Sequence, residues 1–185
     1  LDTSRGLGDV YKRQGSAGPL RAGKGTTFEG GQRVPTIFWG PGIVDTGMVT
    51  EMGSTLDLMK TFAALAGVAP PADRKMDSHD LSPVLKGEGD GPRDEFHYWT
   101  RAELHAIRSG KWKLHLKQRE PVNYGKAIEL AEPELYDLVA DISEAHNVAA
   151  EHPEVVSELL KKVEEHLAET ADSDSDQLVD RLPKE

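Results

Sequence analysis

The chain has 185 residues and a formal net charge of -10, with 22 Lys and Arg against 32 Asp and Glu. It contains no cysteine, which excludes disulfides, thiolate metal sites and cysteine nucleophiles. The acidity and the lack of a dominant basic stripe argue against a nucleic-acid partner, and no apolar run approaches the length of a membrane helix.

The first part of the chain is Gly-rich loop with one apolar run. Residues 1–14 show no periodicity and no helix cap, and we expect them to be disordered or foreign to the native protein. Gly-rich sequence follows from Gly15 to Gly31. The continuous apolar run VPTIFWG (34–40), with Pro35 near its start and Gly-Pro-Gly at its end, predicts a strand buried on both faces of an α/β sheet.

The clearest helix is predicted within STLDLMKTFAALAGVAPP (54–71). Ser54 is a good N-cap, Asp57 stands at the capping-box position, and Gly67 followed by two prolines ends the helix. Its apolar residues cover more than one face, which predicts packing inside a larger domain. Residues 72–95 are expected to form a polar loop around the short apolar stretch DLSPVLKG.

A β-hairpin is predicted from FHYWT (96–100) and ELHAIRSGKWKLHLK (103–117), with Ser109-Gly110 as its two-residue turn. In the second arm apolar and basic residues alternate, so one face of the strand is expected to be apolar and the other basic. The apolar residues are Trp112, Leu114 and Leu116, and the basic residues are Lys111, Lys113, His115 and Lys117.

The C-terminal third is predicted to hold one strand and one helix. ELYDL (134–138) is the strand, and HPEVVSELLKKVEEHLAE (152–169) is an amphipathic helix with Pro153 in its first turn. Residues 170–185 are expected to be a polar, disordered tail. The buried stripe of the helix is expected to consist of Val156, Leu160, Val163 and Leu167.

The stretch GPLRAGKGT (18–26) matches the opening of a phosphate-binding P-loop, G-x-x-x-x-G-K, at Lys24. The match is incomplete, because Gly25 stands where a Ser or Thr should reach magnesium, and no buried strand precedes it and no long helix follows it. A lysine between two glycines can still contact an anion, since the missing side chains permit close approach to the backbone. From the residues alone, a solvated lysine in a turn is the favoured interpretation.

The seven histidines form no recognisable metal motif such as H-E-x-x-H. His115, on the basic face of its strand, is a candidate contact for an anionic ligand, although a half-exposed strand residue is the favoured interpretation. His79 is expected to brace a loop, and His152 and His166 are expected to lie on a helix surface.

Five segments in order, from Gly15 to Glu169, together resemble the arylsulfatase-type sulfatases of the alkaline-phosphatase superfamily. GSAGPLRAGKGTTFEGGQRVPTIFWGPG (15–42) is similar to the family's signature G-K-x-S/T-x-x-E-G-G-x-R-x-P. STLDLMKTFAALAG resembles its S-x-x-D-x-x-P-T helix, with Lys60 in place of Pro, and MDSHDLSPVLKG resembles its D-G-x-D-x-x-P-L-L loop, with Ser78 in place of Gly. The last two are AIRSGKWKLHL and ELYDLVADISEAHNVAAEHPEV, the second being similar to an L-Y-D-L-x-x-D-x-x-E-x-x-N-x-A ending.

The resemblance implies an α/β fold in two parts. Residues 15–95 would be the closing part of an alkaline-phosphatase-like mixed-sheet domain. Residues 96–170 would be a small α+β C-terminal subdomain, an antiparallel sheet with a long C-terminal helix. Residues 1–14 and 171–185 would lie outside both.

The resemblance also implies hydrolysis of sulfate esters, in which a hydrated formylglycine attacks sulfur beside a divalent cation, usually calcium. Lys24 takes the position of the signature lysine, which contacts the substrate sulfate and offsets charge on the leaving-group oxygen. His115 is a further candidate substrate contact, while Glu29 and Arg33 match the signature and suit a loop-bracing role equally well. The substrate would be a small sulfate ester or a sulfated glycan, and such enzymes are periplasmic, secreted or lysosomal.

The departures from the family pattern concern the nucleophile and the metal. No C/S-x-P-x-R sequence occurs, so a formylglycine has no precursor, and the family's paired aspartates and its Asp-Asn pair are absent. We therefore expect a C-terminal piece of a sulfatase that binds no cofactor itself, partners a missing N-terminal region and is inactive alone. One alternative is a non-catalytic module that binds anions or sulfated glycans through Lys24 and the face formed by Lys111, Lys113 and His115. Another is a related phosphodiesterase or phosphonate hydrolase.

Overall fold

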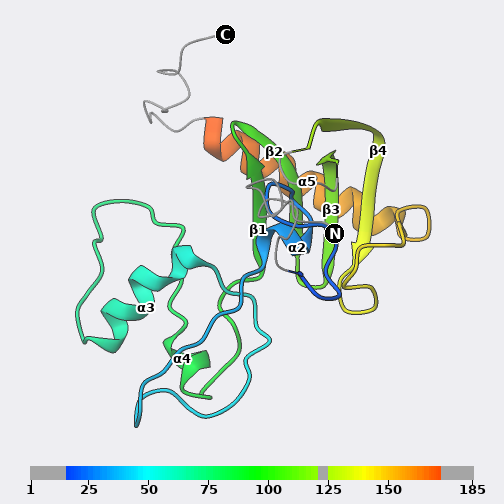
Figure 1. Cartoon of the computed structure of the whole chain (residues 1–185). Helices are drawn as coiled ribbons and strands as arrows, with labels where there is room; N and C mark the ends of the chain where they lie inside the picture. The colour runs from blue at the N-terminus through cyan, green and yellow to red at the C-terminus, as the bar shows by residue number, and fades with distance from the viewer. Residues whose placement is uncertain (1–15, 121–124, 172–185) are drawn as a thin grey trace, which may run out of the picture. The chain divides into compact units, whose positions relative to one another are not determined.

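The computed structural model describes residues 16–120 and 125–171 (Figure 1). They form two compact units, one made of residues 16–33 with the described part of 97–171, and the other of residues 34–96. The sequence did not indicate that residues 16–33 associate with the C-terminal strands. The disorder predicted for residues 1–14 and for the tail concerns residues outside the described ranges, except that Thr170 and Ala171 complete the last helix.

The first unit is built on a four-stranded antiparallel sheet in the order β1-β2-β3-β4. Ser109 pairs with Trp112, so the hairpin turn is Gly110-Lys111 and the predicted turn was one residue too early. Gly110 has a φ of +54°, a left-handed conformation that glycine adopts without steric cost. The strands are β1 (Glu95–Thr100), β2 (Glu103–Ser109), β3 (Trp112–Arg119) and β4 (Ala127–Asp137).

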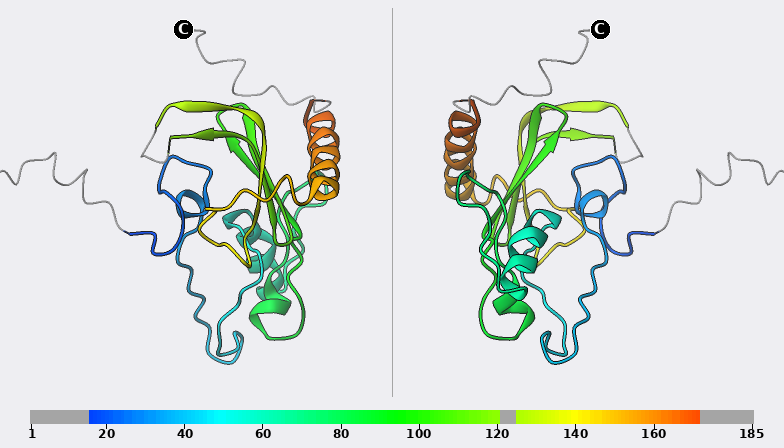
Figure 2. Two further views of the ribbon diagram at one scale, coloured as in Figure 1. Left: turned by 90° about the vertical axis from the view of Figure 1, so that its right-hand side faces the viewer. Right: turned by 90° about the vertical axis from the view of Figure 1, so that its left-hand side faces the viewer.

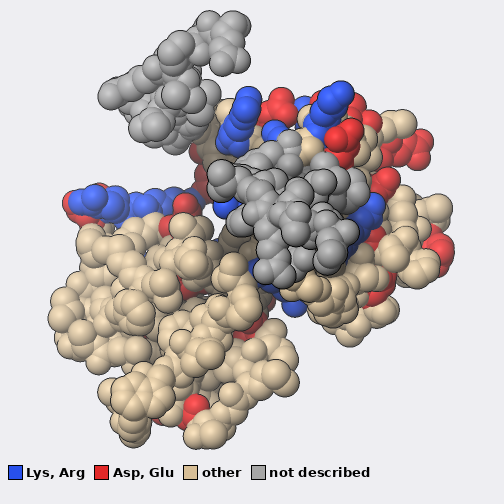
Figure 3. All heavy atoms as spheres, in the orientation of Figure 1, with Lys and Arg blue, Asp and Glu red and all other residues tan. Residues whose placement is uncertain are grey.

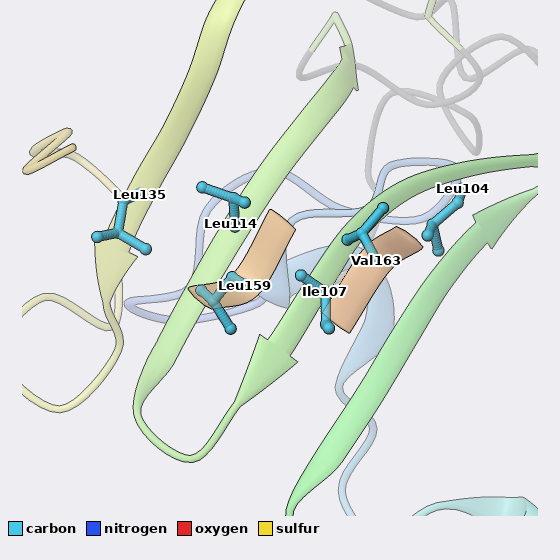
Figure 4. Packing of buried hydrophobic residues seen from close by; sticks show 6 residues of the cluster. All are labelled: Leu104, Ile107, Leu114, Leu135, Leu159 and Val163. Carbon is cyan, nitrogen blue, oxygen red and sulfur yellow. The ribbon is translucent and has the colours of Figure 1, made fainter. Parts of the chain in front are cut away.

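Helix α5 (Pro153–Ala171) covers one face of this sheet (Figure 2). The apolar face predicted for the second hairpin arm is confirmed, because Leu114 is fully buried and Trp112 and Leu116 pack against the same cluster. The predicted helix stripe is right at Val163 and wrong at its end, where Leu167 remains 40% exposed. The core between helix and sheet consists of Leu104, Ile107, Leu114, Leu135, Leu159 and Val163 (Figure 4).

The opposite face of the sheet is covered by residues 16–33, which include the short helix α2 (Glu29–Gln32) (Figure 2). Lys113 and His115 point to this face, and neither is exposed to solvent. The prediction that basic residues share one face of β3 is therefore confirmed. Lys113 and His115 on that face are nevertheless buried. The covering segment lies more than 60 positions before β3 in the chain, so local alternation could not reveal it.

The second unit contains a short 3₁₀ turn η1 (Thr55–Asp57), helix α3 (Leu58–Leu65) and the single-turn helix α4 (Ser82–Leu85). The predicted capping box is confirmed, since the Ser54 side chain accepts from the Leu56 amide and Asp57 accepts from the Ser54 amide. The helix also stops as predicted, with Gly67 at a φ of +67°.

The strand predicted at residues 34–40 is absent, and this segment is extended coil. Ile37 is 92% exposed and Trp39 is 85% exposed, so the prediction of burial on both faces is wrong for the described chain. A strand needs neighbours that pair with its amide and carbonyl groups. No strand in the described part of the chain pairs with this segment.

Candidate functional site

Lys24 stands in a tight turn, and its side chain is exposed. The amide and the hydroxyl of Thr26 both donate to the carbonyl oxygen of Gly23, at 3.3 Å and 2.8 Å. Gly25 has a φ of +92°, which residues with a side chain rarely adopt. Within the described ranges the Lys24 ammonium has neither a hydrogen-bond nor an ion-pair partner, so its charge is available to a ligand.

Gly30 and Gly31 allow this turn to pack directly on helix α2. A Cβ on Gly30 would lie 2.4 Å from the carbonyl oxygen of Arg21, and a Cβ on Gly31 would lie 2.4 Å from that of Thr26. The Gly30 amide instead donates to the Arg21 carbonyl oxygen at 3.0 Å. The two adjacent glycines therefore let the turn lie closer to α2 than a residue with a side chain would permit.

Glu29 lies beneath the turn with its side chain only 1% exposed. Its Oε1 atom accepts from Lys113 Nζ at 2.8 Å and from the Tyr98 hydroxyl at 3.1 Å. Its Oε2 atom pairs with Arg33 Nε and lies 3.6 Å from Arg108 Nη1. Burial raises the pKa of Glu29, but Lys113 and Arg33 outweigh burial and lower that pKa to about 2. The carboxylate is thus charged and fully paired, which is the bracing role expected from the sequence.

Glu144 is fully buried and connects several parts of this site. Its Oε2 atom accepts from the Glu29 amide at 2.7 Å, and its Oε1 atom lies 2.9 Å from His115 Nε2 and 3.0 Å from Lys113 Nζ. Its carbonyl oxygen accepts from Arg21 Nη1 at 2.6 Å. Burial raises the pKa of Glu144, but the His115 hydrogen bond and the Lys113 charge bring it below its ordinary value.

The backbone of Glu144 has a φ of +49°, although it is not a glycine. Such a conformation costs on the order of 1 kcal/mol or more and persists only when its surroundings impose it. The Glu144 amide donates to the Asp141 carbonyl oxygen at 3.2 Å, and the Asp141 carboxylate accepts from the amides of Ala145 and His146. The turn 141–146 is therefore built to hold Glu144 in place.

His115 is fully buried, which makes the favoured interpretation of a half-exposed strand residue wrong. Burial lowers the pKa of His115, so the imidazole is neutral. Because a carboxylate only accepts hydrogen bonds, the proton lies on Nε2 and is donated to Glu144. Its ring lies 5.0 Å from the Phe28 ring, measured between centroids. A contact between His115 and substrate stays a prediction.

The anion-binding face proposed on β3 does not exist as a surface. Lys113 and His115 are both 0% exposed and are paired with carboxylates. Lys111 is exposed but pairs with Asp137 at 2.6 Å. Of the residues considered for anion contact in the sequence, only Lys24 is both exposed and without a partner in the described chain.

Comparison with known proteins identifies the family. The family model for the C-terminal region of aryl-sulfatase matches residues 91–181. Arylsulfatase A of Homo sapiens is 38% identical over 167 residues, which cover 80% of this chain and 33% of that protein. The chain belongs to the arylsulfatase-type sulfatase family. N-acetylgalactosamine-6-sulfatase of Mus musculus is 46% identical over 118 residues, which cover 62% of this chain and 22% of that protein.

Solved sulfatase structures share the fold. The PsFucS1 sulfatase from Pseudoalteromonas sp. aligns with a TM-score of 0.72 at 26% identity, over 81% of this chain and 32% of that one. Ps i-CgsB in complex with k-i-k-neocarrahexaose aligns with a TM-score of 0.64 at 29% identity, over 80% of this chain and 31% of that one. The chain thus spans about a third of the length of arylsulfatase A and of the PsFucS1 sulfatase.

The sulfatase signature explains why the P-loop interpretation of GPLRAGKGT fails. A P-loop would require a helix that begins directly at Gly25, whereas α2 begins at Glu29 and is only four residues long. The EGG part of the signature instead supplies the brace and the two glycines on which the Lys24 turn packs.

Three residues of this candidate site were not singled out from the sequence for the contacts they make here. Lys113 was placed on the basic face of its strand, Glu144 was only one position of the L-Y-D-L ending, and Arg21 was given no role. Arg21 lies with its guanidinium 4.1 Å from the Phe28 ring centroid and donates to the Glu144 carbonyl oxygen. One signal in the sequence could have pointed to Glu144: it stands in a motif of the same family pattern that contains Glu29.

A third buried carboxylate, Asp57, lies in the other unit and has a structural role. It is 0% exposed and forms an ion pair with Arg93. It also accepts from the amides of Ser54 and His79, so it connects the start of α3 to the DSHDLSP loop. His79 therefore braces its loop as predicted, through its backbone amide.

No group of three or more His, Asp or Glu side chains suited to a metal ion occurs in residues 16–120 and 125–171. No helix in the same ranges is both long and apolar enough to cross a membrane. Calcium and formylglycine remain what the family resemblance implies.

Proposed function

We propose that this chain is the C-terminal region of a sulfate-ester hydrolase in which Lys24 contacts the sulfate of the substrate. The supporting observation is an exposed ammonium without a partner in the described chain, on a turn that two glycines and a buried ionic network hold in place. A positive charge fixed in advance stabilises negative charge that develops on the leaving oxygen, because no reorganisation is needed during the reaction. Hydrolysis is proposed for the protein in which this region joins the other two thirds of the sulfatase length.

The substrate class is a sulfate ester of an aryl group or a sugar. The names of the related proteins support this range, since they include arylsulfatase A and N-acetylgalactosamine-6-sulfatase. One solved structure is a complex with the oligosaccharide k-i-k-neocarrahexaose.

Neither formylglycine nor calcium fits the residues of this chain. The sequence has no C/S-x-P-x-R, and the described residues gather no set of metal-ligating side chains. The step proposed for this region is therefore electrostatic. Lys24 binds the sulfate ester and offsets charge on the oxygen that leaves.

The chain alone is expected to give no turnover of p-nitrophenyl sulfate, with or without added calcium. The reason is that Lys24 supplies charge but no nucleophile. Turnover that survives purification and disappears in Lys24→Ala would contradict this expectation.

A chimera tests the role of Lys24 directly. Residues 16–171 would replace the matching third of Homo sapiens arylsulfatase A, and p-nitrophenyl sulfate hydrolysis would be measured. Lys24→Ala is expected to lower kcat by about 10²–10³-fold, the usual loss for one preorganised charge-stabilising group. The control is Lys126→Ala, an exposed lysine of the same unit, which should leave kcat unchanged. A folded, active chimera in which Lys24→Ala retains full kcat would overturn the proposal.

The exposed Lys24 also supports a second candidate, a non-catalytic module that binds sulfated glycans. This candidate predicts that the chain alone binds heparin saturably, with an affinity that falls with salt and with Lys24→Ala. A related phosphodiesterase or phosphonate hydrolase would instead give a chimera that prefers p-nitrophenyl phenylphosphonate to the sulfate ester.

A further inference from the structure

Glu144 contacts both ends of the loop that contains Lys24. Its carbonyl oxygen accepts from Arg21 Nη1 at 2.6 Å, three residues before Lys24. Its carboxylate accepts from the Glu29 amide at 2.7 Å, five residues after Lys24. Each of these bonds joins residues more than 110 positions apart in the chain. One residue of the turn 141–146 thus holds the Lys24 loop at both of its ends.

The remaining contacts of Glu144 attach it to the sheet. Its Oε1 atom lies 2.9 Å from His115 Nε2, to which it is hydrogen-bonded, and forms an ion pair with Lys113 Nζ at 3.0 Å; both residues lie on the same face of β3. The Lys113 ammonium in turn donates to the Thr27 carbonyl oxygen at 2.7 Å. The position of the loop relative to β3 therefore depends on Glu144 and on the lysine beside it.

The backbone of Glu144 supports a role beyond packing. A left-handed conformation at a fully buried, non-glycine residue is retained only where its surroundings impose it. In this conformation the carbonyl oxygen meets Arg21 while the carboxylate meets Glu29. A single residue thereby uses its main chain and its side chain on the same loop.

We propose that Glu144 is a positioning residue that holds the Lys24 loop, and with it the Lys24 ammonium, against the sulfate ester. The catalytic part of this inference rests on the proposed function of Lys24. The positional part, that Glu144 restricts the loop, does not depend on hydrolysis.

Glu144→Gln is the informative variant, because every contact of the carboxylate is with a donor. Oε1 faces His115 Nε2 and the Lys113 ammonium, and Oε2 accepts from the Glu29 amide, so an amide nitrogen placed at either position faces an N–H group. Asp57→Asn is the matched control. Asp57 is equally buried, it also receives only donors, from Arg93, Ser54 and His79, and it lies in the other unit.

The positional part is tested with a spin label on the chain itself. Since the chain has no cysteine, Lys24→Cys accepts a single nitroxide. We expect a restricted electron paramagnetic resonance spectrum in the parent and in Asp57→Asn, and a shift to faster motion in Glu144→Gln. The proposal would be overturned if Glu144→Gln left the mobility of the label unchanged. It would also be overturned if Asp57→Asn increased that mobility as much as Glu144→Gln does. If Glu144→Gln fails to fold, Arg21→Met removes one of the two attachments and should also increase mobility.

The catalytic part is tested by a double-mutant cycle in the arylsulfatase A chimera. Glu144→Gln is expected to lower kcat by about tenfold to a hundredfold, the scale of a misplacement of about 1 Å at a catalytic group. In the Lys24→Ala background the same substitution should have almost no further effect on kcat, because it acts through Lys24. Equal losses in both backgrounds would contradict the proposal. An active chimera in which Lys24→Ala keeps full kcat, while the label gains mobility in Glu144→Gln, would refute only the proposed function.

Discussion

Lys113 Nζ lies 2.8 Å from Glu29 Oε1 and thereby joins β3 to the start of α2, 84 positions earlier in the chain. Both side chains are essentially inaccessible, at 0% and 1% exposure. The same ammonium donates to the Thr27 carbonyl oxygen, lies 3.0 Å from Glu144 and sits 4.3 Å from the centroid of the Tyr98 ring. This one cation is shared by two buried carboxylates beneath the Lys24 turn, and Arg33 places a second positive charge beside Glu29.

Replacing Lys113 should therefore destabilise the first unit strongly. Lys113→Met keeps much of the volume but leaves two buried carboxylates without their shared cation, and breaking a buried pair costs about 3–5 kcal/mol. Urea unfolding followed by circular dichroism measures the loss. Lys111→Met is the control, because Lys111 is exposed and its pair with Asp137 should contribute no more than about 1 kcal/mol. Similar losses of unfolding free energy in the two variants would show that the buried ion pairs of Lys113 contribute no more than the exposed pair of Lys111.

Acid should weaken the same unit. The pKa of His115 is lowered from 6.5 by burial, so the unfolded chain binds this proton more readily, and stability is complete above pH 6.5 and falls below it. The pKa of Glu29 is lowered from 4.5 to about 2, although burial opposes this, because Lys113 and Arg33 favour the charged form. That carboxylate contributes about 3 kcal/mol above pH 4.5, which is lost as the pH falls toward 2.

His115→Gln separates the two effects, because its amide can still donate to Glu144 but does not titrate. Urea unfolding across pH 8 to 3 is the measurement. As the pH falls below 6.5, the parent should lose more stability than the variant, in which only His105, whose pKa burial also lowers, still contributes a histidine-linked loss. Parallel curves for the two proteins would contradict the role given to His115.

The glycines under the Lys24 turn give a steric prediction. In Gly30→Ala the new Cβ would meet two carbonyl oxygens, of Arg21 at 2.4 Å and of Ala22 at 2.5 Å, so the turn must move away from α2. We expect faster trypsin cleavage after Lys24 under native conditions, quantified by mass spectrometry. Gly47→Ala is the control, since its Cβ would meet nothing within 4 Å. An unchanged cleavage rate in Gly30→Ala would show that the turn does not depend on this close approach.

Local elements could be predicted from the sequence, and distant pairings could not. The capping box at Ser54 and Asp57, the hairpin and the C-terminal helix each rest on spacings of a few residues, which the chain shows directly. The alternation in β3 correctly placed Leu114 in the core. It could not reveal that residues 16–33 cover the other face, because the contacts of Lys113 and His115 are set by segments 29 to 86 positions away. Lys24 was found through the family signature, whereas Glu144 required the structure.

The exposed apolar residues of the second unit lead to the last prediction. Ile37 is 92% exposed, Trp39 85% and Met48 88%, and the face of this unit in view shows few charged atoms (Figure 3). Exposed apolar area of this kind favours association, since its burial removes it from water. We expect the chain to self-associate as its concentration rises, measured by sedimentation velocity.

The double variant Ile37→Lys/Trp39→Lys should shift the sedimentation distribution toward the monomer, because two charges would have to be desolvated on contact. The matched control is Val139→Lys, which places a lysine at an apolar residue that is 82% exposed in the other unit. That substitution should leave association nearly unchanged. If Val139→Lys disrupts association as strongly as the double variant, net charge rather than the apolar segment governs it. If the parent stays monomeric throughout, the exposed side chains are tolerated singly and the segment is no association site.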